Sequence, residues 1–125
     1  MKFRAICENH LYAKAYSKGK RAVTRNLAVY VLPDYMAERL RRAHPQKIRV
    51  NRIGLTVTKK LGGAVVRNRV KRILREGLRQ AENELNLKKG YLIVIVARAS
   101  IVDASSVHIK KELTKALTSL KMIEE

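Results

Sequence analysis

The stretch "AVVRNRVKRILREGLR", residues 64–79, interleaves aliphatic and basic side chains at the spacing of an α-helix. On a wheel of about 100° per residue the aliphatic side chains share one side, with Gly77 in its middle. They are Val66, Val70, Ile73, Leu74, Leu78 and Ala81. The opposite side and its borders are polar and cationic, with Asn68, Arg72, Arg75 and Arg79 in the middle and Arg67, Lys71 and Arg69 beside them. The pattern predicts a helix over about 64–85 that covers a sheet, with Gly77 permitting close approach to that sheet.

The cationic side of this helix is either a solvated surface or a binding surface. Solvated helices usually mix charge signs for pairing along the helix. Here only Glu76 offers a partner, and Arg72 is its only basic neighbour four residues away. Arginine suits phosphate because its planar donors match phosphate oxygens. Membrane binding is disfavoured because the apolar side is needed for the sheet and has no Trp or Phe. The pattern therefore favours nucleic acid.

Outward from this helix, the chain predicts an α+β single-domain sandwich of order α-β-β-β-α-β-α, with helices packed on a small central sheet. The further elements are a helix over 8–19, then two or three strands, of which 26–32 and 53–58 are placed. A strand over 90–97 and a last helix over about 103–123 follow the basic helix. The continuous apolar run of 90–97 predicts a central strand covered on both faces. Residues 33–47 predict an enlarged loop or a short helical insertion.

Composition agrees with a single basic domain, residues 1–125, of a size that can bury a core. The net charge is +18, and residues 1–79 carry nearly all of the excess. Such a charge asymmetry indicates a polyanionic partner. The single cysteine, Cys7, excludes an intrachain disulfide, and we find neither a secretory signal nor a run of transmembrane length. We therefore expect a cytoplasmic protein.

The run "KKLGGAVVRNRVKRILREGLR", residues 59–79, closely resembles the signature of the bacterial ribonuclease P protein subunit. The similarity extends to "LYAKAYSKGKRAVTRNLAVYVL", residues 11–32, where an aromatic helix, a basic turn and a tyrosine-bearing strand follow in the expected order. Residues 33–47 depart from the family as an enlarged connection, which adds Arg39, Arg41, Arg42 and Lys47. Gly63 stands where the family commonly has asparagine.

The resemblance implies a small basic cofactor of a large catalytic RNA, which together with it removes the 5′ leader of precursor tRNA. It implies that the RNA coordinates magnesium and performs the hydrolysis, so that no catalytic residue, metal or cofactor is assigned to the protein. The implied partners are the ribonuclease P RNA and precursor tRNA, with no membrane or protein partner. The family's fold also implies a left-handed β-α-β crossover, against the usual rule.

Two sets of site residues follow from the resemblance. The set expected to bind the RNA subunit is Arg67, Asn68, Arg69, Lys71, Arg72, Arg75 and Arg79. The set expected to bind the single-stranded leader is Tyr12, Tyr16, Arg25, Tyr30, Lys59 and Lys60. Tyrosine rings stack on unpaired bases without selecting a sequence, which suits a variable leader. The alternatives are that the tyrosines belong to the core and that the basic residues are ordinary surface charge.

Other functions are less well supported by the sequence. A protein-only nuclease would need clustered acidic ligands or an acid–base pair, but His10, His44 and His108 lie in three separate segments. Sequence-specific DNA binding would need a helix–turn–helix pair or zinc ligands, and neither is visible. The main alternative is a structural RNA-binding protein, such as a ribosomal protein, which would not need a stacking cleft.

Overall fold

The computed structural model describes residues 3–6, 9–35, 39 and 51–123, with residues 3–5 described as backbone only. Cys7, His44 and most of the predicted insertion over 33–47, including Arg41, Arg42 and Lys47, lie outside the described residues. Arg39 is described and exposed.

Five strands form one mixed sheet in the order β1-β4-β5-β3-β2. They are β1 Phe3–Ala5, β2 Lys20–Val23, β3 Leu27–Pro33, β4 Asn51–Thr56 and β5 Tyr91–Ala97. β5 lies in the middle, parallel to β4 and antiparallel to β3, and its residues 92–95 are buried. The predicted central strand is therefore confirmed.

In the described part of the chain, three α-helices pack on this sheet, namely α1 Asn9–Lys18, α3 Ala64–Glu84 and α4 Ser106–Ser119. Short 3-10 helices, η1 Lys59–Leu61 and η2 Ala99–Asp103, precede α3 and α4. Ser105 caps α4 by accepting a hydrogen bond from the backbone N–H of His108, as a serine at this position favours. Gly63 precedes α3 and provides no side-chain cap for the start of this helix.

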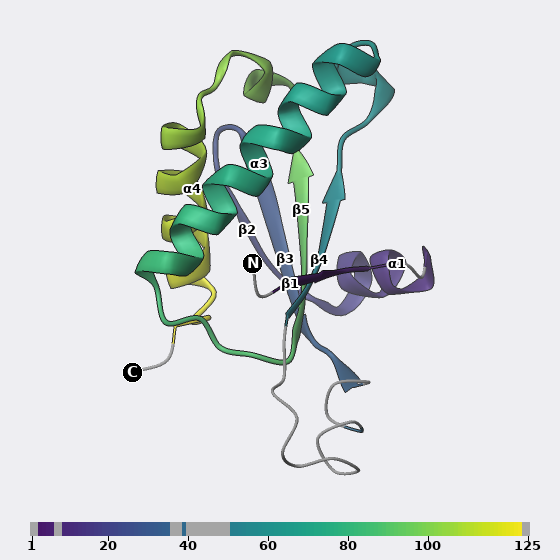
Figure 1. The fold of residues 1–125 in the computed structure, drawn as a ribbon. Helices are drawn as coiled ribbons and strands as arrows, with labels where there is room; N and C mark the ends of the chain where they lie inside the picture. Colours follow the sequence, from purple (N-terminus) through teal and green to yellow (C-terminus); the bar gives the residue numbers. More distant parts are fainter. Residues whose placement is uncertain (1–2, 7–8, 36–38, 40–50, 124–125) are drawn as a thin grey trace.

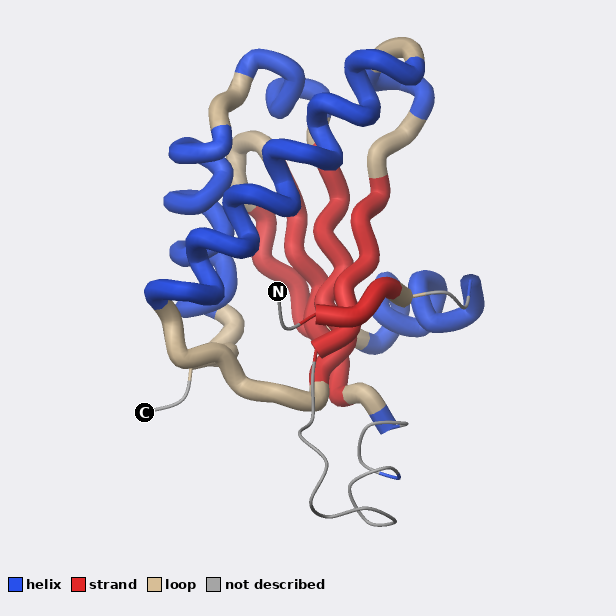
Figure 2. Tube along the Cα trace, viewed as in Figure 1, coloured by secondary structure: helices blue, strands red, loops and turns tan. Residues whose placement is uncertain are grey.

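The two faces of the sheet support separate cores because side chains of a strand alternate between faces. The larger core packs one face against α3 and α4 and includes Leu74, Leu78, Ile95 and Leu113. The smaller core packs the other face against α1. Figure 2 shows α3 and α4 together on one side of the strands and α1 apart from them.

The connection from β4 through α3 to β5 is left-handed. The two strands are parallel neighbours, and in Figure 1 both arrows point upward. There α3 crosses in front of the sheet and β5 lies to the left of β4. A right-handed connection in that view would move to the right, so this crossover takes the uncommon hand. The expectation from the family resemblance is confirmed.

Most of the predicted elements are confirmed, and β2 provides a strand whose residues the sequence did not locate. Three further differences concern β1, Gly77 and the end of the last helix. The structure adds β1 before the first helix, parallel to β4. Gly77 lies against α4 rather than against the sheet, since a Cβ there would meet Ile109 Cγ2 at 2.7 Å. The last helix ends at Ser119 rather than near Ile123, because Lys121 takes a left-handed backbone conformation with φ of 58°. The predicted order α-β-β-β-α-β-α otherwise holds from α1 onward.

The connection between β3 and β4 is fixed at both ends. The carboxylate of Asp34 is buried and accepts two hydrogen bonds from Arg52, from Nε at 2.7 Å and from Nη2 at 2.9 Å. The side chain of Asn51 donates to the carbonyl of Lys88 and accepts from the backbone N–H of Tyr91. The Asp34 contacts join the end of β3 to β4, and the Asn51 contacts tie the start of β4 to the start of β5.

Candidate nucleic-acid interface

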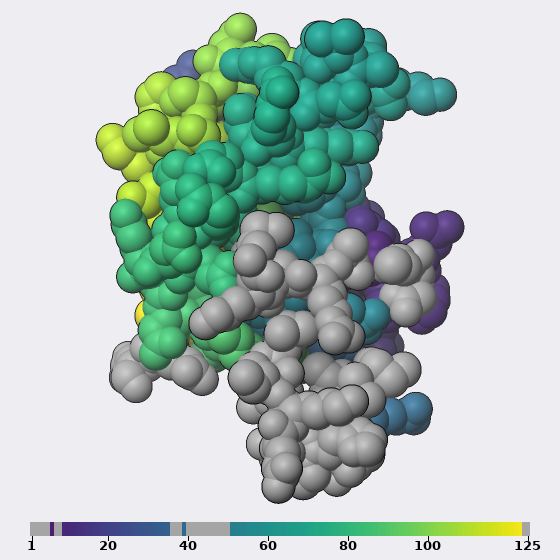
Figure 3. All heavy atoms as spheres, in the orientation of Figure 1, coloured from purple at the N-terminus to yellow at the C-terminus, as the bar shows by residue number. Residues whose placement is uncertain are grey.

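The outer side of α3 is an exposed polar and cationic surface. Asn68, Arg72, Arg75 and Arg79 are all exposed there, while Leu74 and Leu78 on the opposite side are buried. In Figure 3 α3 runs obliquely across the face turned to the reader, with side chains projecting along it. The predicted division of the helix into a core side and a cationic side is confirmed. We call these four outward residues the α3 outer surface.

Glu76 is paired with Arg79, three residues further along the helix, and not with Arg72, its basic neighbour at a spacing of four. Its carboxylate accepts from Arg79 Nη2 at 2.5 Å and from Gln80 Nε2 at 2.9 Å. The hydrogen bonds from Arg79 and Gln80 lower the pKa of Glu76 to about 2. One cation of the α3 outer surface is thus partly neutralised within the helix, whereas Arg72 and Arg75 have no ion pair among the described residues.

The residues that border this surface are in three different situations. Arg69 donates to the carbonyls of Val102 at 2.8 Å and Ala104 at 3.3 Å, so it ties the first turns of α3 to η2. The Nε atom of Arg67 is buried and has no hydrogen-bond partner among the described residues. Lys71 is half-buried. Arg69 therefore has a structural task in addition to the predicted binding role.

Two tyrosines form a partly open aromatic surface on the α1 face of the sheet. The rings of Tyr16 and Tyr30 meet edge to face, with centroids 5.1 Å apart and planes at 74°. Tyr16 is 41% exposed, and its hydroxyl makes a 2.6 Å hydrogen bond with Thr56 Oγ1. These contacts fix the ring of Tyr16 while leaving part of it in solvent. We call Tyr16, Tyr30 and Thr56 the tyrosine surface.

Tyr12 occupies a more buried position on the same helix. It is half-buried and packs against the smaller core. A Cβ at Gly54 would lie 2.6 Å from its Cε1 atom, so only glycine on β4 leaves room for this ring. The question of whether the tyrosines face the core or the cleft thus has two answers, with Tyr12 packed on the sheet and Tyr16 at its open edge.

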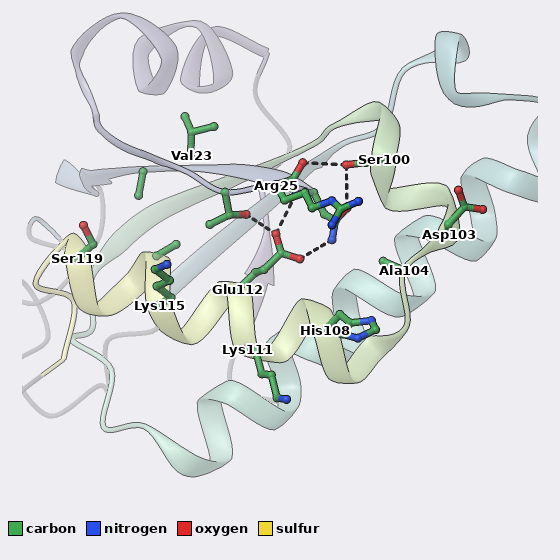
Figure 4. Close-up of a pocket in the computed structure, with 14 residues that line it drawn as sticks. Val23, Arg25, Ser100, Asp103, Ala104, His108, Lys111, Glu112, Lys115 and Ser119 are labelled. Carbon is green, nitrogen blue, oxygen red and sulfur yellow. Dashed lines mark hydrogen bonds between the residues drawn. The ribbon is translucent and has the colours of Figure 1, made fainter.

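The basic residues predicted beside the tyrosines are divided between two places. Lys59 and Lys60 are exposed on η1, which links the end of β4 at Thr56 with the start of α3. Arg25 lies in the turn between β2 and β3, where it lines a groove on the opposite, α4 side of the sheet (Figure 4). The structure therefore does not bring Arg25 together with the tyrosine surface.

The groove beside Arg25 has a volume of about 750 Å³ and contains a hydrogen-bond network. The carboxylate of Glu112 accepts from Thr24 Oγ1 at 2.6 Å, from Asn26 N at 2.9 Å and from Asn26 Nδ2 at 2.6 Å. Burial opposes the charge of Glu112, but these hydrogen bonds outweigh it and lower its pKa. Ser100 donates to the carbonyl of Arg25. The turn is thereby held from α4 and from η2.

Sequence reasoning missed residues whose placement depends on strand pairing. Thr56 is the partner of Tyr16, and Arg21 on β2 stands opposite Tyr30. The four residues of β2 were not recognised as a strand, although they are followed after a short turn by the apolar strand β3. That hairpin arrangement is the signal that could have found Arg21.

Within the described part of the chain, no group of three or more His, Cys, Asp or Glu side chains could hold a metal ion. No described helix combines the length and apolarity that crossing a membrane requires.

Comparison with known proteins gives a consistent result. The family described as Ribonuclease P matches residues 1–121. A protein named "Ribonuclease P protein component" from Caldanaerobacter subterraneus subsp. tengcongensis is 36% identical over 114 residues, which covers 91% of this chain and 86% of that protein. One of the same name from Clostridium acetobutylicum is 40% identical over 100 residues, covering 80% and 74%.

Solved structures are similar over nearly the whole chain. The RNase P protein of Staphylococcus aureus gives a TM-score of 0.73 at 26% identity, covering 99% of each chain. The RNase P protein of Thermotoga maritima gives a TM-score of 0.69 at 21% identity, covering 98% of this chain and 99% of that one, and so supports the fold alone.

Proposed function

The chain belongs to the Ribonuclease P family, whose members are protein components of an endoribonuclease, and we propose that it binds both the RNA subunit of that enzyme and the 5′ leader of precursor tRNA. The observation that carries this proposal is the separation of an exposed cationic helix face from a partly open aromatic surface. The first suits a folded RNA, and the second suits a single strand.

The α3 outer surface is the proposed contact with the RNA subunit. Arg72 and Arg75 are exposed, and their guanidinium groups can donate two parallel hydrogen bonds to phosphate oxygens. The first turns of α3 are held in place because Arg69 is bound to η2. Binding therefore does not have to order the helix backbone that carries these arginines, which supports tight docking.

The tyrosine surface is the proposed contact with the leader. Each stacked base is worth about 1–3 kcal/mol on an aromatic ring and requires no particular sequence. The hydrogen bond between Tyr16 and Thr56 holds one ring ready for stacking. Lys59 and Lys60 lie between this surface and α3, where they can neutralise phosphates of RNA that passes from one to the other.

In this proposal the protein acts by binding and positioning. The RNA subunit holds magnesium and performs the hydrolysis, and no catalytic residue is assigned to the protein. Holding the leader restricts the motion of the scissile phosphate relative to the RNA, and such restriction lowers the barrier to reaction. We further propose that the protein acts in the cytoplasm and needs no second protein.

Reconstitution tests this function directly. The purified protein would be added to a bacterial ribonuclease P RNA at low magnesium, and cleavage of a 5′-extended precursor tRNA would be followed. We expect cleavage with both components and none with the protein alone. Tight RNA binding without stimulated cleavage would contradict the proposal and favour a structural RNA-binding protein.

The docking surface is tested by the salt dependence of RNA binding. Arg72→Ala with Arg75→Ala should flatten the slope of log affinity against log salt by about one unit for each phosphate that the variant no longer binds. The matched control is Lys111→Ala with Lys115→Ala, which removes the same charge from exposed positions one turn apart on α4. Equal slopes for the two double variants would exclude the α3 outer surface as the specific contact.

A further inference from the structure

The α1 face of the sheet extends past the tyrosine surface to the edge strand β2. Among the described strands it pairs with β3 alone, so it forms one border of the described sheet. Arg21 stands directly opposite Tyr30, and Val23 stands opposite Ala28. Because directly paired residues share a face, Arg21 and Val23 project on the same side as Tyr30. Lys20 and Ala22 project on the other side.

Nothing in the described structure covers this extension. Both Arg21 and Val23 are exposed, and Val23 keeps 52% of its surface in solvent. Figure 4 shows the Val23 side chain directed away from Glu112, although Val23 also borders the groove on the α4 side. Helix α1 packs over β3 and β5 instead. Among the described residues, the side chain of Arg21 makes no hydrogen bond or ion pair.

We propose that the single-stranded leader continues from Tyr30 onto β2, where Arg21 binds a leader phosphate and Val23 packs against a sugar or base. This inference rests on the proposed leader-binding function and adds a second contact zone to it. Cβ atoms of directly opposed residues lie about 5 Å apart, so the longer arginine side chain reaches a phosphate beside a base stacked on Tyr30.

Charge and position single out Arg21 for this role. Arg25, the arginine first expected beside the tyrosines, lines the groove on the other side of the sheet. Arg52, on β4 of the same sheet, forms an ion pair with the buried carboxylate of Asp34. Arg21 is thus the arginine in register with the tyrosine surface, and its guanidinium can both pair with phosphate and stack on a base.

The competing explanation is that Arg21 protects an exposed sheet edge, because charged side chains on edge strands discourage aggregation. Protection of that kind would be independent of the tRNA ligand. It would also be shared by Lys20, which carries the same charge at the neighbouring position but on the opposite face. Lys20 therefore provides a matched control.

The test compares Arg21→Ala and Lys20→Ala in the reconstituted holoenzyme. Affinity would be measured for a precursor with a long leader, a precursor with a one-nucleotide leader, and mature tRNA. We expect Arg21→Ala to weaken binding of the long-leader precursor about tenfold, as removal of one charge-assisted hydrogen bond predicts. Binding of the other two ligands should not change, and Lys20→Ala should match the wild type for all three.

Two further variants and a stability control complete the test. Arg21→Lys should recover part of the affinity because it keeps the charge, and Val23→Ser should give a smaller leader-dependent loss. Thermal unfolding of each variant would verify the fold. Equal effects of Arg21→Ala and Lys20→Ala, or a loss that ignores leader length, would overturn the inference.

The outcome separates this inference from the proposed function. If the wild-type holoenzyme shows no preference for the leader-bearing precursor, the leader-binding function itself fails. If the wild type shows the preference and Arg21→Ala retains it in full, only the extension onto β2 fails.

Discussion

The two faces of the sheet differ in how completely they are covered. On one face α3 and α4 enclose an apolar core whose central side chains, such as Leu74 and Ile95, are fully buried. On the other face α1 covers only part of the strands and leaves Tyr16, Arg21 and Val23 exposed. The covered face provides most of the apolar burial that stabilises folding. The partly covered face keeps rigid aromatic and cationic groups available to a ligand.

The largest expected effect is on the covered face. Leu74→Ala removes a fully buried side chain from the larger core, so it should lower the free energy of unfolding by about 2–5 kcal/mol. Urea unfolding would measure the change. Arg72→Ala, on the outer side of the same helix, should stay within about 0.5 kcal/mol of the wild type. Similar losses for both would mean that α3 does not have one buried and one free side.

The second prediction concerns the contact between α3 and α4 on the covered face. Alanine usually stabilises a helix over glycine by about 1 kcal/mol. At Gly77, however, a Cβ would lie 2.7 Å from Ile109 Cγ2 and 3.2 Å from the backbone nitrogen of Lys110. We therefore expect Gly77→Ala to destabilise the protein by about 1–3 kcal/mol.

A double-mutant cycle would show whether this destabilisation comes from the helix packing. Ile109→Ala makes room beside residue 77, so Gly77→Ala should cost less in that background than in the wild type. An unchanged cost, or stabilisation by Gly77→Ala alone, would contradict the close packing of α3 on α4.

On the partly covered face, we expect a substitution to change the binding of precursor tRNA rather than the stability of the fold. Tyr16→Ala removes an exposed ring and should weaken binding of leader-bearing precursor by about 1–3 kcal/mol, with mature tRNA binding unchanged. Tyr16→Phe keeps the ring and loses only the hydrogen bond to Thr56, so it should retain most of the affinity. Both would be compared in the reconstituted holoenzyme. Equal losses for precursor and mature tRNA would point to a folding defect instead.

The sequence alone predicted a helix or strand wherever a local pattern of apolar residues extended along it. The 3.6-residue pattern of α3 predicted its buried and exposed sides, and the apolar run of β5 predicted a central strand, because both signals are local. The three residues of β1 could not be recognised in this way, since β1 forms by pairing with β4 far along the chain. A strand so short has no periodicity of its own.

For the candidate site, the sequence predicted which types of residue take part better than it predicted which residues lie next to one another. The sequence indicated Tyr16 and Tyr30 as members of one surface, and their rings do meet. The family resemblance also placed Arg25 there. Arg25 instead lies in a turn that lines the groove on the α4 side, and no local sequence pattern shows which way that turn is directed. The sequence also left the partner of Glu76 open, because both three- and four-residue spacings bring helical side chains together, and the structure pairs it with Arg79.

The smallest expected effect is on the pH dependence of stability, through the hydrogen bonds by which Glu112 holds the β2–β3 turn. Hydrogen bonds from Thr24 and Asn26 lower the pKa of Glu112 in the folded protein despite its partial burial. A lowered folded-state pKa gives stability that is complete above the usual glutamate range and is lost as pH falls through the folded-state pKa. Glu112→Gln should therefore be less stable than the wild type at pH 7, and this difference should shrink as the solution is acidified below about pH 4.5.

Because Glu112 is partly exposed, we expect this difference to remain below about 1 kcal/mol, measured by thermal unfolding at several pH values. The same variant also tests whether the two faces act independently. Glu112 holds the turn from the α4 side, whereas Tyr16 and Arg21 lie on the α1 side, so leader binding at pH 7 should not change. If Glu112→Gln weakened binding of the leader-bearing precursor as much as Tyr16→Ala does, the turn would couple the two faces. Their division into a stabilising face and a binding face would then be wrong.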